Sequence, residues 1–121
     1  MENAVLHKII SRMRWWLSRN NPKAFWTNYN VTLHANFETR KQSLDYFNWR
    51  NAQYLFYDEL MPTAGFDGKV ILDYGCGPCH DMVGFVENSK PSKLVGADIS
   101  QTSLHEGGKR LKLHEIGRAH V

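Results

Sequence analysis

The stretch from Val70 to Pro78, which reads Val-Ile-Leu-Asp-Tyr-Gly-Cys-Gly-Pro, decides the predicted fold of this chain. Its first three residues are an unbroken apolar run, which is typical of a strand buried on both faces of a parallel sheet. The following turn contains Gly75 and Gly77, where a ligand can approach the backbone without meeting a Cβ atom. A binding site is therefore expected at the carboxyl end of this strand.

The residues that follow continue the same pattern. A helix is expected over residues 81–87, and a second apolar strand over 94–97 ends at Asp98. Another helix begins at Gln101. The order strand, turn, helix, strand, helix indicates an α/β fold with an open parallel sheet. The inward side chains of the helix over residues 81–87 are expected to be Met82, Val83 and Val86.

An amphipathic helix is predicted at the start of the chain. Residues 4–19 carry apolar side chains at helical spacing, and a polar segment ending in Pro22 stops the helix. The apolar stripe is expected to pack on its own domain, which is the commoner use of such a pattern. The alternative is a basic helix that lies on a membrane surface through Trp15 and Trp16.

A second helix is predicted ahead of the sheet. Residues 22–42 are polar and aromatic without a clear period, which indicates a loop with short helical turns. Residues 43–60 predict the helix, with Ser43 as its N-cap. Met61 and Pro62 end it, and a turn-rich connection leads to the first strand.

The composition is that of an ordinary globular domain. The chain has 121 residues, is 42% hydrophobic and 22% charged, and carries a net charge of +3, which argues against disorder. Its basic residues are scattered, so no nucleic-acid partner is predicted. The two cysteines cannot form a disulfide framework, and no signal peptide or membrane span is evident. A cytoplasmic protein without membrane attachment is expected.

Two carboxylates flank the glycine turn. Asp98, 23 residues beyond Gly75, can accept hydrogen bonds from the two hydroxyls of a ribose. Nicotinamide-binding folds share this feature, so Asp98 alone predicts only a nucleoside-like cofactor. Asp73 would repel a pyrophosphate and attract an ammonium group. The dinucleotide pattern G-x-G-x-x-G also fails, because His80 occupies its last position.

Together these features resemble motif I and the next strand of class I S-adenosylmethionine-dependent methyltransferases over residues 70–104. The resemblance implies a Rossmann-like parallel sheet preceded by N-terminal helices, the cofactor S-adenosyl-L-methionine and a small-molecule methyl acceptor. It leaves the acceptor and the catalytic residues unidentified, and Ile99 is expected near the adenine. The cofactor-binding residues implied by the resemblance are Asp73, Tyr74, Gly75, Cys76, Gly77, Pro78, Cys79, Asp98, Ile99 and Ser100.

The stretch from Phe37 to Asp58 is similar to the helix that precedes the sheet in some small-molecule methyltransferases of this class. Helices there often close over the cofactor. By that similarity Tyr46, Trp49 and Arg50 are predicted lid contacts, with Arg50 reaching the cofactor carboxylate. The alternative is a packing helix with an exposed Arg50.

One position departs from the family pattern. Members commonly have a third glycine where this chain has Cys79, and a side chain there is expected to crowd the cofactor or push the helix back, weakening binding. Cys79 keeps open a non-catalytic Rossmann-like binding subunit. The feature that Asp98 shares with nicotinamide-binding folds keeps open a fragment of a nicotinamide-dinucleotide-binding oxidoreductase.

Residues 76–80 also read C-x-x-C-H, a pattern found at covalent haem attachment sites and at redox or zinc half-sites. The absence of an export signal argues against haem, and the absence of a second cysteine pair argues against a four-ligand zinc site. No metal site is predicted. The other histidines are scattered, and none is predicted to be catalytic; they are His7, His34, His105, His114 and His120.

The predicted organisation has three parts. Residues 1–62 form an N-terminal helical region that includes the possible lid, and residues 63–114 form the first part of the methyltransferase domain, with about two of its strands. Residues 115–121 look like the translation of a common sequencing adapter, and the alternative is a natural helix end. A chain that stops there is expected to be unstable or prone to aggregation on its own.

Overall fold

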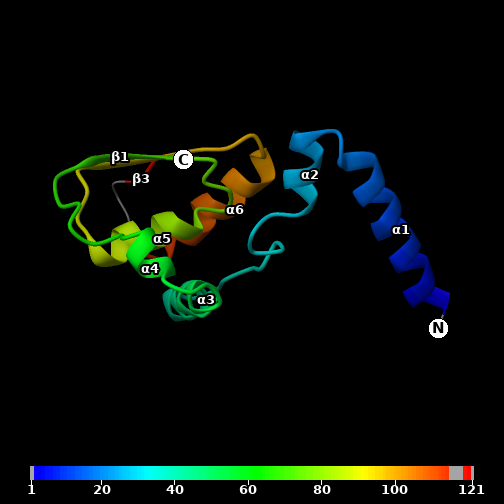
Figure 1. The fold of residues 1–121 in the computed structure, drawn as a ribbon, viewed down its shortest axis with the longest axis horizontal. Helices are drawn as coiled ribbons and strands as arrows, with labels where there is room; N and C mark the ends of the chain where they lie inside the picture. Colours follow the sequence, from blue (N-terminus) through cyan, green and yellow to red (C-terminus); the bar gives the residue numbers. More distant parts are fainter. Residues whose placement is uncertain (1, 115–118, 121) are drawn as a thin grey trace.

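The computed structural model describes residues 2–114 and 119–120 (Figure 1). The described residues form six helices and three strands, and from β1 onward strands and helices alternate as the sequence predicts for an α/β fold. In chain order they are α1 (Glu2–Ser18), α2 (Pro22–Asn28), α3 (Arg40–Ala52), α4 (Tyr57–Leu60), β1 (Val70–Tyr74), α5 (His80–Asn88), β2 (Lys93–Ala97), α6 (Gln101–Lys112) and β3 (Ala119–His120).

The sheet begins with the predicted unit of two parallel strands joined by a helix. β1 and β2 pair in parallel from Val70 opposite Lys93 to Tyr74 opposite Ala97, and α5 forms the connection between them. The two residues of β3 pair in parallel with the other side of β2, so the strand order is β1-β2-β3. The rest of the predicted adapter-derived segment lies outside the described residues.

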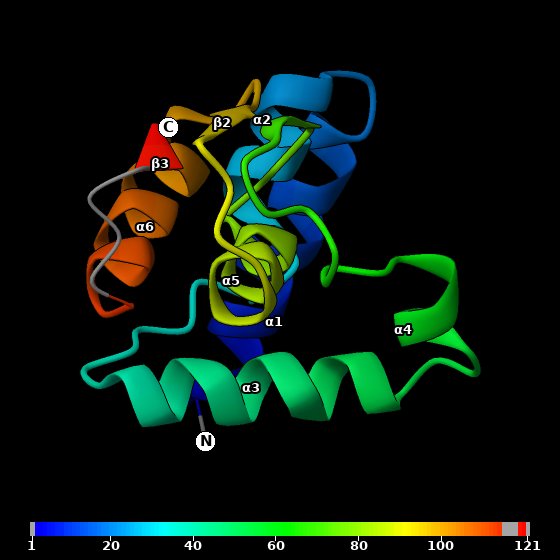
Figure 2. The same ribbon diagram turned by 90° about the vertical axis from the view of Figure 1, so that its left-hand side faces the viewer.

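The core lies between the sheet and the helices on one of its faces. Figures 1 and 2 show α5 and α6 under the sheet, with α3 on the far side of α5. Met82 and Val83 are completely buried, as predicted, and Leu94 of β2 is buried against them. The remaining buried apolar residues of this cluster are Phe47, Cys76, Cys79, Phe85 and Leu111.

The prediction that β1 is buried on both faces is wrong. Val70, Leu72 and Tyr74 are 71%, 63% and 88% exposed, whereas Ile71 packs against the core. The reason is the placement of the helices, since α5 and α6 lie on the same face of the sheet. Nothing in residues 2–114 covers the opposite face of β1, so alternate side chains of its apolar run point to solvent.

The predicted helix over 43–60 is wrong at its start and in its length. Thr39 is the N-cap, because its side-chain oxygen accepts a hydrogen bond from the backbone N–H of Gln42 at 3.2 Å. Ser43 lies inside α3 and is completely buried. The helix ends at Ala52, and Phe56 with φ +59° separates it from the short α4. A left-handed residue cannot continue a right-handed helix.

The expectation that α1 packs its apolar stripe on its own domain is also wrong. Figure 1 shows α1 projecting away from the sheet and its helices, with α2 beside its C-terminal end. Leu6, Met13 and Leu17 of the stripe are 56%, 58% and 66% exposed. None of the helices formed by the described residues is both long enough and apolar enough to cross a bilayer.

Candidate functional site

A cavity of about 730 Å³ opens at the carboxyl ends of β1 and β2, where the sequence predicts a binding site. Its volume is within the range of small-ligand sites. One wall is the glycine turn with the end of β2, and the opposite wall comes from α2 and the turn after it. The lining residues are Pro22, Trp26, Asn30, Val31, Arg50, Tyr74, Gly75, Cys76, Gly77, His80, Asp81, Ala97, Asp98, Ile99 and Ser103.

The glycine turn is held against the end of β2 by backbone hydrogen bonds. The N–H groups of Gly75 and Cys76 both donate to the carbonyl oxygen of Ala97, at 2.7 and 3.0 Å. Gly75 has φ +77° and Gly77 has φ +53°, which only glycine adopts at little cost. The turn therefore presents bare backbone to the cavity, as the sequence predicts.

Asp98 links the turn to the start of α6. One carboxylate oxygen accepts from the N–H of Gly77 at 2.8 Å, and the other accepts from the N–H of Ser100 at 2.7 Å. Each carboxylate oxygen has a second lone pair, so Asp98 can still accept hydrogen bonds from a ligand. Ile99 lines the cavity and is 53% exposed, whereas Ser100 is buried as the N-cap of α6.

Asp73 lies at the end of β1, just before the lining residues, and does not itself line the cavity. Its Oδ2 atom is buried without a hydrogen-bond partner. Burial, followed by the nearby charges of Asp81 and Asp98, raises the pKa of Asp73 to about 6. A desolvated carboxylate oxygen without a partner is costly, so this position suits a cationic group.

Cys79 does not line the cavity, and neither does Pro78. Cys79 has φ +61°, and its side chain is completely buried against α6, where Gly107 makes room for it. A Cβ atom at Gly107 would lie 2.4 Å from the Cys79 sulfur. The cysteine side chain is thus directed to the packing between the turn and α6, and the expected crowding of the cofactor space is not seen.

Of the three predicted lid residues, the structure brings only Arg50 to the cavity. Its guanidinium lies 3.8 Å from the carboxylate of Asp81 and 4.6 Å from the centre of the Tyr57 ring. The side chain is only 18% exposed, so the alternative of an exposed Arg50 is wrong. Tyr46 and Trp49 line a separate surface hollow between α3 and residues 36–37.

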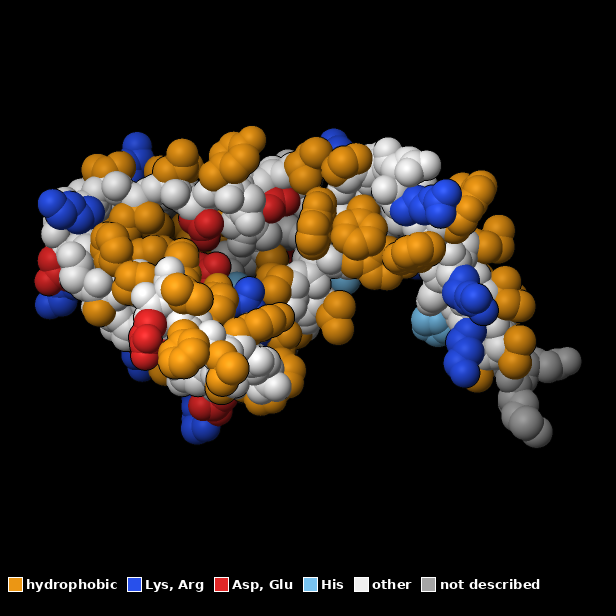
Figure 3. Space-filling view, viewed as in Figure 1, with side chains coloured by type: hydrophobic (Ala, Val, Ile, Leu, Met, Phe, Trp, Pro, Cys, Tyr) orange, Lys and Arg blue, Asp and Glu red, His pale blue; other side chains and the backbone are white. Residues whose placement is uncertain are grey.

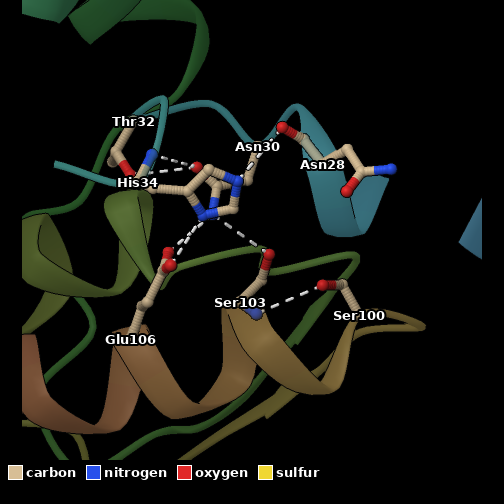
Figure 4. A network of polar contacts seen from close by, with 7 residues as sticks. All are labelled: Asn28, Asn30, Thr32, His34, Ser100, Ser103 and Glu106. Atoms are coloured by element: carbon tan, nitrogen blue, oxygen red, sulfur yellow. Dashed lines mark hydrogen bonds and ion pairs between the residues drawn. The ribbon is translucent and has the colours of Figure 1, made fainter. Parts of the chain in front are cut away.

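The predicted site does not include residues 22–31, which form one wall of the cavity. A hydrogen-bond network holds the turn after α2 onto α6 (Figure 4). The side-chain amide of Asn30 donates to Glu106 at 2.6 Å and to Ser103 at 3.3 Å. In the sequence Asn30 is recognisable only as a glycosylation sequon, yet it is 3% exposed.

His34 completes this network. Figure 4 shows its imidazole ring between α2 and α6. Its two nitrogens face the carboxylate of Glu106 at 2.6 Å and the carbonyl oxygen of Asn28 at 3.1 Å. The hydrogen bond to Glu106 raises the pKa of His34, because both acceptors favour the doubly protonated ring. The turn that carries Asn30 is therefore fixed from two sides.

His80 lines the cavity but is held as a neutral ring. Its Nδ1 accepts from the guanidinium of Arg110 at 3.2 Å, so its Nε2–H donates to the side-chain Oδ1 of Asn51 at 3.1 Å. The ring stacks on Phe47, with centroids 5.1 Å apart. Burial, then the charges of Arg110 and Arg50, lowers the pKa of His80 to about 3. A ring with both nitrogens engaged is poorly placed to act as a base.

The C-x-x-C-H segment, residues 76–80, forms part of the glycine turn and the start of α5. Cys76 and Cys79 are free and buried, and a hydrogen bond with Cys76, together with burial, raises the pKa of Cys79. A buried thiol with a raised pKa is unreactive. Within the described parts of the chain, no group of three histidine, cysteine, aspartate or glutamate side chains is arranged to hold a metal ion.

The other histidines lie away from the cavity. His7 and His105 are exposed on α1 and α6, and His114 is buried between Ser43 and Glu87. The side chain of His120 is outside the described structure.

No known family model, curated protein or solved structure matches this chain. Membership of the methyltransferase family therefore stays a prediction that depends on residues 70–104 and on the geometry of the cavity.

Proposed function

We propose that this chain binds S-adenosylmethionine in the cavity and is the cofactor-binding part of a methyltransferase that acts on a small molecule. One observation carries the proposal: Asp73 has a buried oxygen without a partner, next to a turn of bare backbone. The other two carboxylates are satisfied, since Asp98 accepts two backbone N–H groups and Asp81 accepts from the Tyr57 hydroxyl at 2.7 Å. The ammonium group of a methionine moiety at this turn would bring a compensating positive charge close to Asp73, with water or the backbone of the turn between them.

The residues present fit the three parts of this cofactor. Asp98 would accept from the ribose hydroxyls with its remaining lone pairs. Ile99 and Trp26 offer apolar surface at the cavity for the adenine. Gly75 and Gly77 would admit the methionine portion, and Arg50 would face its carboxylate.

S-adenosylmethionine, when bound, would supply a methyl group for transfer to a nucleophile. The contribution of this chain would be orientation, because holding the two reactants at attack distance removes much of the barrier. His80 is neutral and engaged at both nitrogens, so it is not proposed as a base. No residue is assigned to proton transfer.

The charge of the cavity favours this cofactor over a dinucleotide. Asp81 and Asp98 line it, and Asp73 lies directly behind. Arg50 is the one arginine or lysine among the described lining residues, and it already faces Asp81 at 3.8 Å. A pyrophosphate would bring two further negative charges to this place, which is unfavourable.

Three ligands test the proposal on the full chain. S-adenosylhomocysteine keeps the adenosine and amino-acid portions of the cofactor, 5′-methylthioadenosine keeps only the adenosine portion, and NAD carries a pyrophosphate. Calorimetry at about pH 7.5, where a carboxyl with a pKa of about 6 is ionised, is expected to show S-adenosylhomocysteine binding most tightly. Binding of NAD without binding of S-adenosylhomocysteine would overturn the proposal.

One substitution separates the role of Asp73 from general damage. Asp73→Asn keeps the shape and removes the charge, so it should weaken S-adenosylhomocysteine by about tenfold or more and leave 5′-methylthioadenosine nearly unchanged. The control is Asp45→Asn, which removes an exposed carboxylate outside the cavity. Equal losses for both ligands would contradict the assignment of Asp73 to the ammonium.

A further inference from the structure

The N-terminal helix contacts the rest of the chain through its polar side. The hydroxyl of Tyr29 donates to the carbonyl oxygen of Ser11 at 3.1 Å. Ser18 is 2% exposed, and its hydroxyl bonds back to the carbonyl of Arg14 at 2.7 Å. At 100° per residue, Ser11 and Ser18 lie on the same side of the helix. This side of α1 therefore faces α2.

The opposite side of α1 is a continuous apolar stripe, which we call the α1 stripe. All its members are between 41% and 66% exposed. Figure 3 shows hydrophobic side chains along the side of α1 that is turned away from the domain. No described segment packs on it. The α1 stripe consists of Val5, Leu6, Ile9, Ile10, Met13, Trp16 and Leu17.

Basic residues border the α1 stripe. Residues 4–19 contain four arginines and lysines and no acidic residue. On the helical wheel Lys8, Arg12 and Arg19 lie along the edge beside Val5, and Arg14 lies beyond the opposite edge. Long basic side chains at such borders can lie along an apolar surface while their charges reach upward to the polar layer of a bilayer.

We propose that α1 lies in the interface of an anionic phospholipid bilayer, with the α1 stripe among the acyl chains and the basic border at the headgroups. The combination of an apolar stripe, tryptophan and a basic border is that of interfacial helices. Charge complementarity selects lipid over a second copy. Two such helices that paired through their stripes would bring Arg12 and Lys8 near like charges, with no acid on residues 4–19 to compensate.

Co-flotation of the full chain with vesicles tests the proposal. Binding is expected to vesicles of three parts phosphatidylcholine to one part phosphatidylserine, and to be much weaker to pure phosphatidylcholine. Raising sodium chloride from about 0.1 M to about 0.5 M should release the protein, because salt screens the attraction. If the unsubstituted protein does not bind the anionic vesicles, the proposal is overturned.

Apolar variants test the α1 stripe directly. Leu6→Ser with Leu17→Ser should abolish flotation, since the change removes apolar surface from the α1 stripe. Both side chains are more than half exposed, so the fold should tolerate it. The matched control is Leu55→Ser with Leu60→Ser, which changes two leucines that are 86% and 80% exposed near α4. Equal losses in both pairs would mean nonspecific apolar adhesion and would overturn the proposal.

Charge variants test the basic border. Each basic residue near an anionic surface changes the affinity by a factor of about five, so Lys8→Gln with Arg12→Gln should weaken binding by about 25-fold. The control pair, Lys69→Gln with Lys93→Gln, removes exposed charges elsewhere and should have little effect. Light scattering after gel filtration supplies the rival outcome. A dimer that the leucine variants on α1 convert to a monomer, without vesicle binding, would assign the stripe to a second copy.

Discussion

Two neighbouring glycines of α6 allow the packing of Cys79 to be measured against an internal control. Gly107 and Gly108 both lie inside the helix Gln101–Lys112. A Cβ atom at Gly108 would meet nothing within 4 Å, so Gly108→Ala should stabilise the protein by about 1 kcal/mol through helix propensity alone. Gly107→Ala has the same gain in helix propensity, but its new Cβ atom would meet close neighbours.

The contacts at Gly107 set the size of the opposing effect. Its added Cβ atom would lie 2.4 Å from the Cys79 sulfur, 3.0 Å from the carbonyl carbon of Pro78 and 3.1 Å from the Cys79 Cβ. Overpacking of this kind costs about 1–3 kcal/mol. The free energy of unfolding of Gly107→Ala should therefore be about 1–3 kcal/mol below that of Gly108→Ala.

Cys79→Gly should rescue Gly107→Ala. The change removes two of the three close contacts and also the strain of a non-glycine residue at φ +61°. In the unsubstituted protein the same change leaves the space of the sulfur empty, so the two substitutions should couple by about 1–2 kcal/mol. Urea unfolding followed by far-UV circular dichroism measures all four proteins. Equal stability of the two alanine variants, or additive effects in the double variant, would refute the packing of Cys79 against Gly107.

Three further predictions concern the carboxylates and His80. Asp98→Asn should lower the free energy of unfolding by about 1–3 kcal/mol, because an amide can accept only one of the hydrogen bonds from Gly77 and Ser100; unchanged urea unfolding would contradict this. The folded-state pKa of Asp73 is raised to about 6, so its contribution to stability should fall as the pH rises from about 4 to about 6. In Asp73→Asn, the free energy of unfolding measured with urea should no longer fall in this way between these pH values. A pH profile identical to that of the unsubstituted protein would argue against a buried carboxyl. The pKa of His80 is lowered to about 3, so the unfolded chain takes up this proton first and stability should fall as the pH drops from about 6.5 toward 3. An acid titration followed by circular dichroism measures this fall. A stability that stays flat over this range would show that the ring is not buried.

The parts of the fold that the sequence predicts well are those with a local signal. The apolar run of β1, the glycine turn and the helix with Met82 and Val83 inward all follow from neighbouring residues. Boundaries were harder to predict. Thr39 and Ser43 are both favourable N-caps by residue type, with serine slightly preferred. The structure uses Thr39, because Ser43 is buried and its hydroxyl accepts from the guanidinium of Arg110 at 2.7 Å.

Burial was predicted least well, because it depends on which elements cover a surface. The apolar run of β1 carries no mark that one of its faces is open, and the α1 stripe has the same period as a helix packed in a core. Val70 and Leu72 are exposed because the helices lie on the other face of the sheet. Such a placement follows from the whole chain and from no single segment.

The glycine turn after β1 was determined by the sequence itself. Gly75 and Gly77 follow the end of a parallel strand, where open α/β sheets bind their ligands. The requirement for bare backbone there is local, so the residues of the turn predict this wall of the cavity. The opposite wall was decided only by the tertiary structure. Asn30 reaches Ser103 across 73 positions of the chain, and a hydrogen bond between residues so far apart depends on how the helices pack, which residue spacing does not encode.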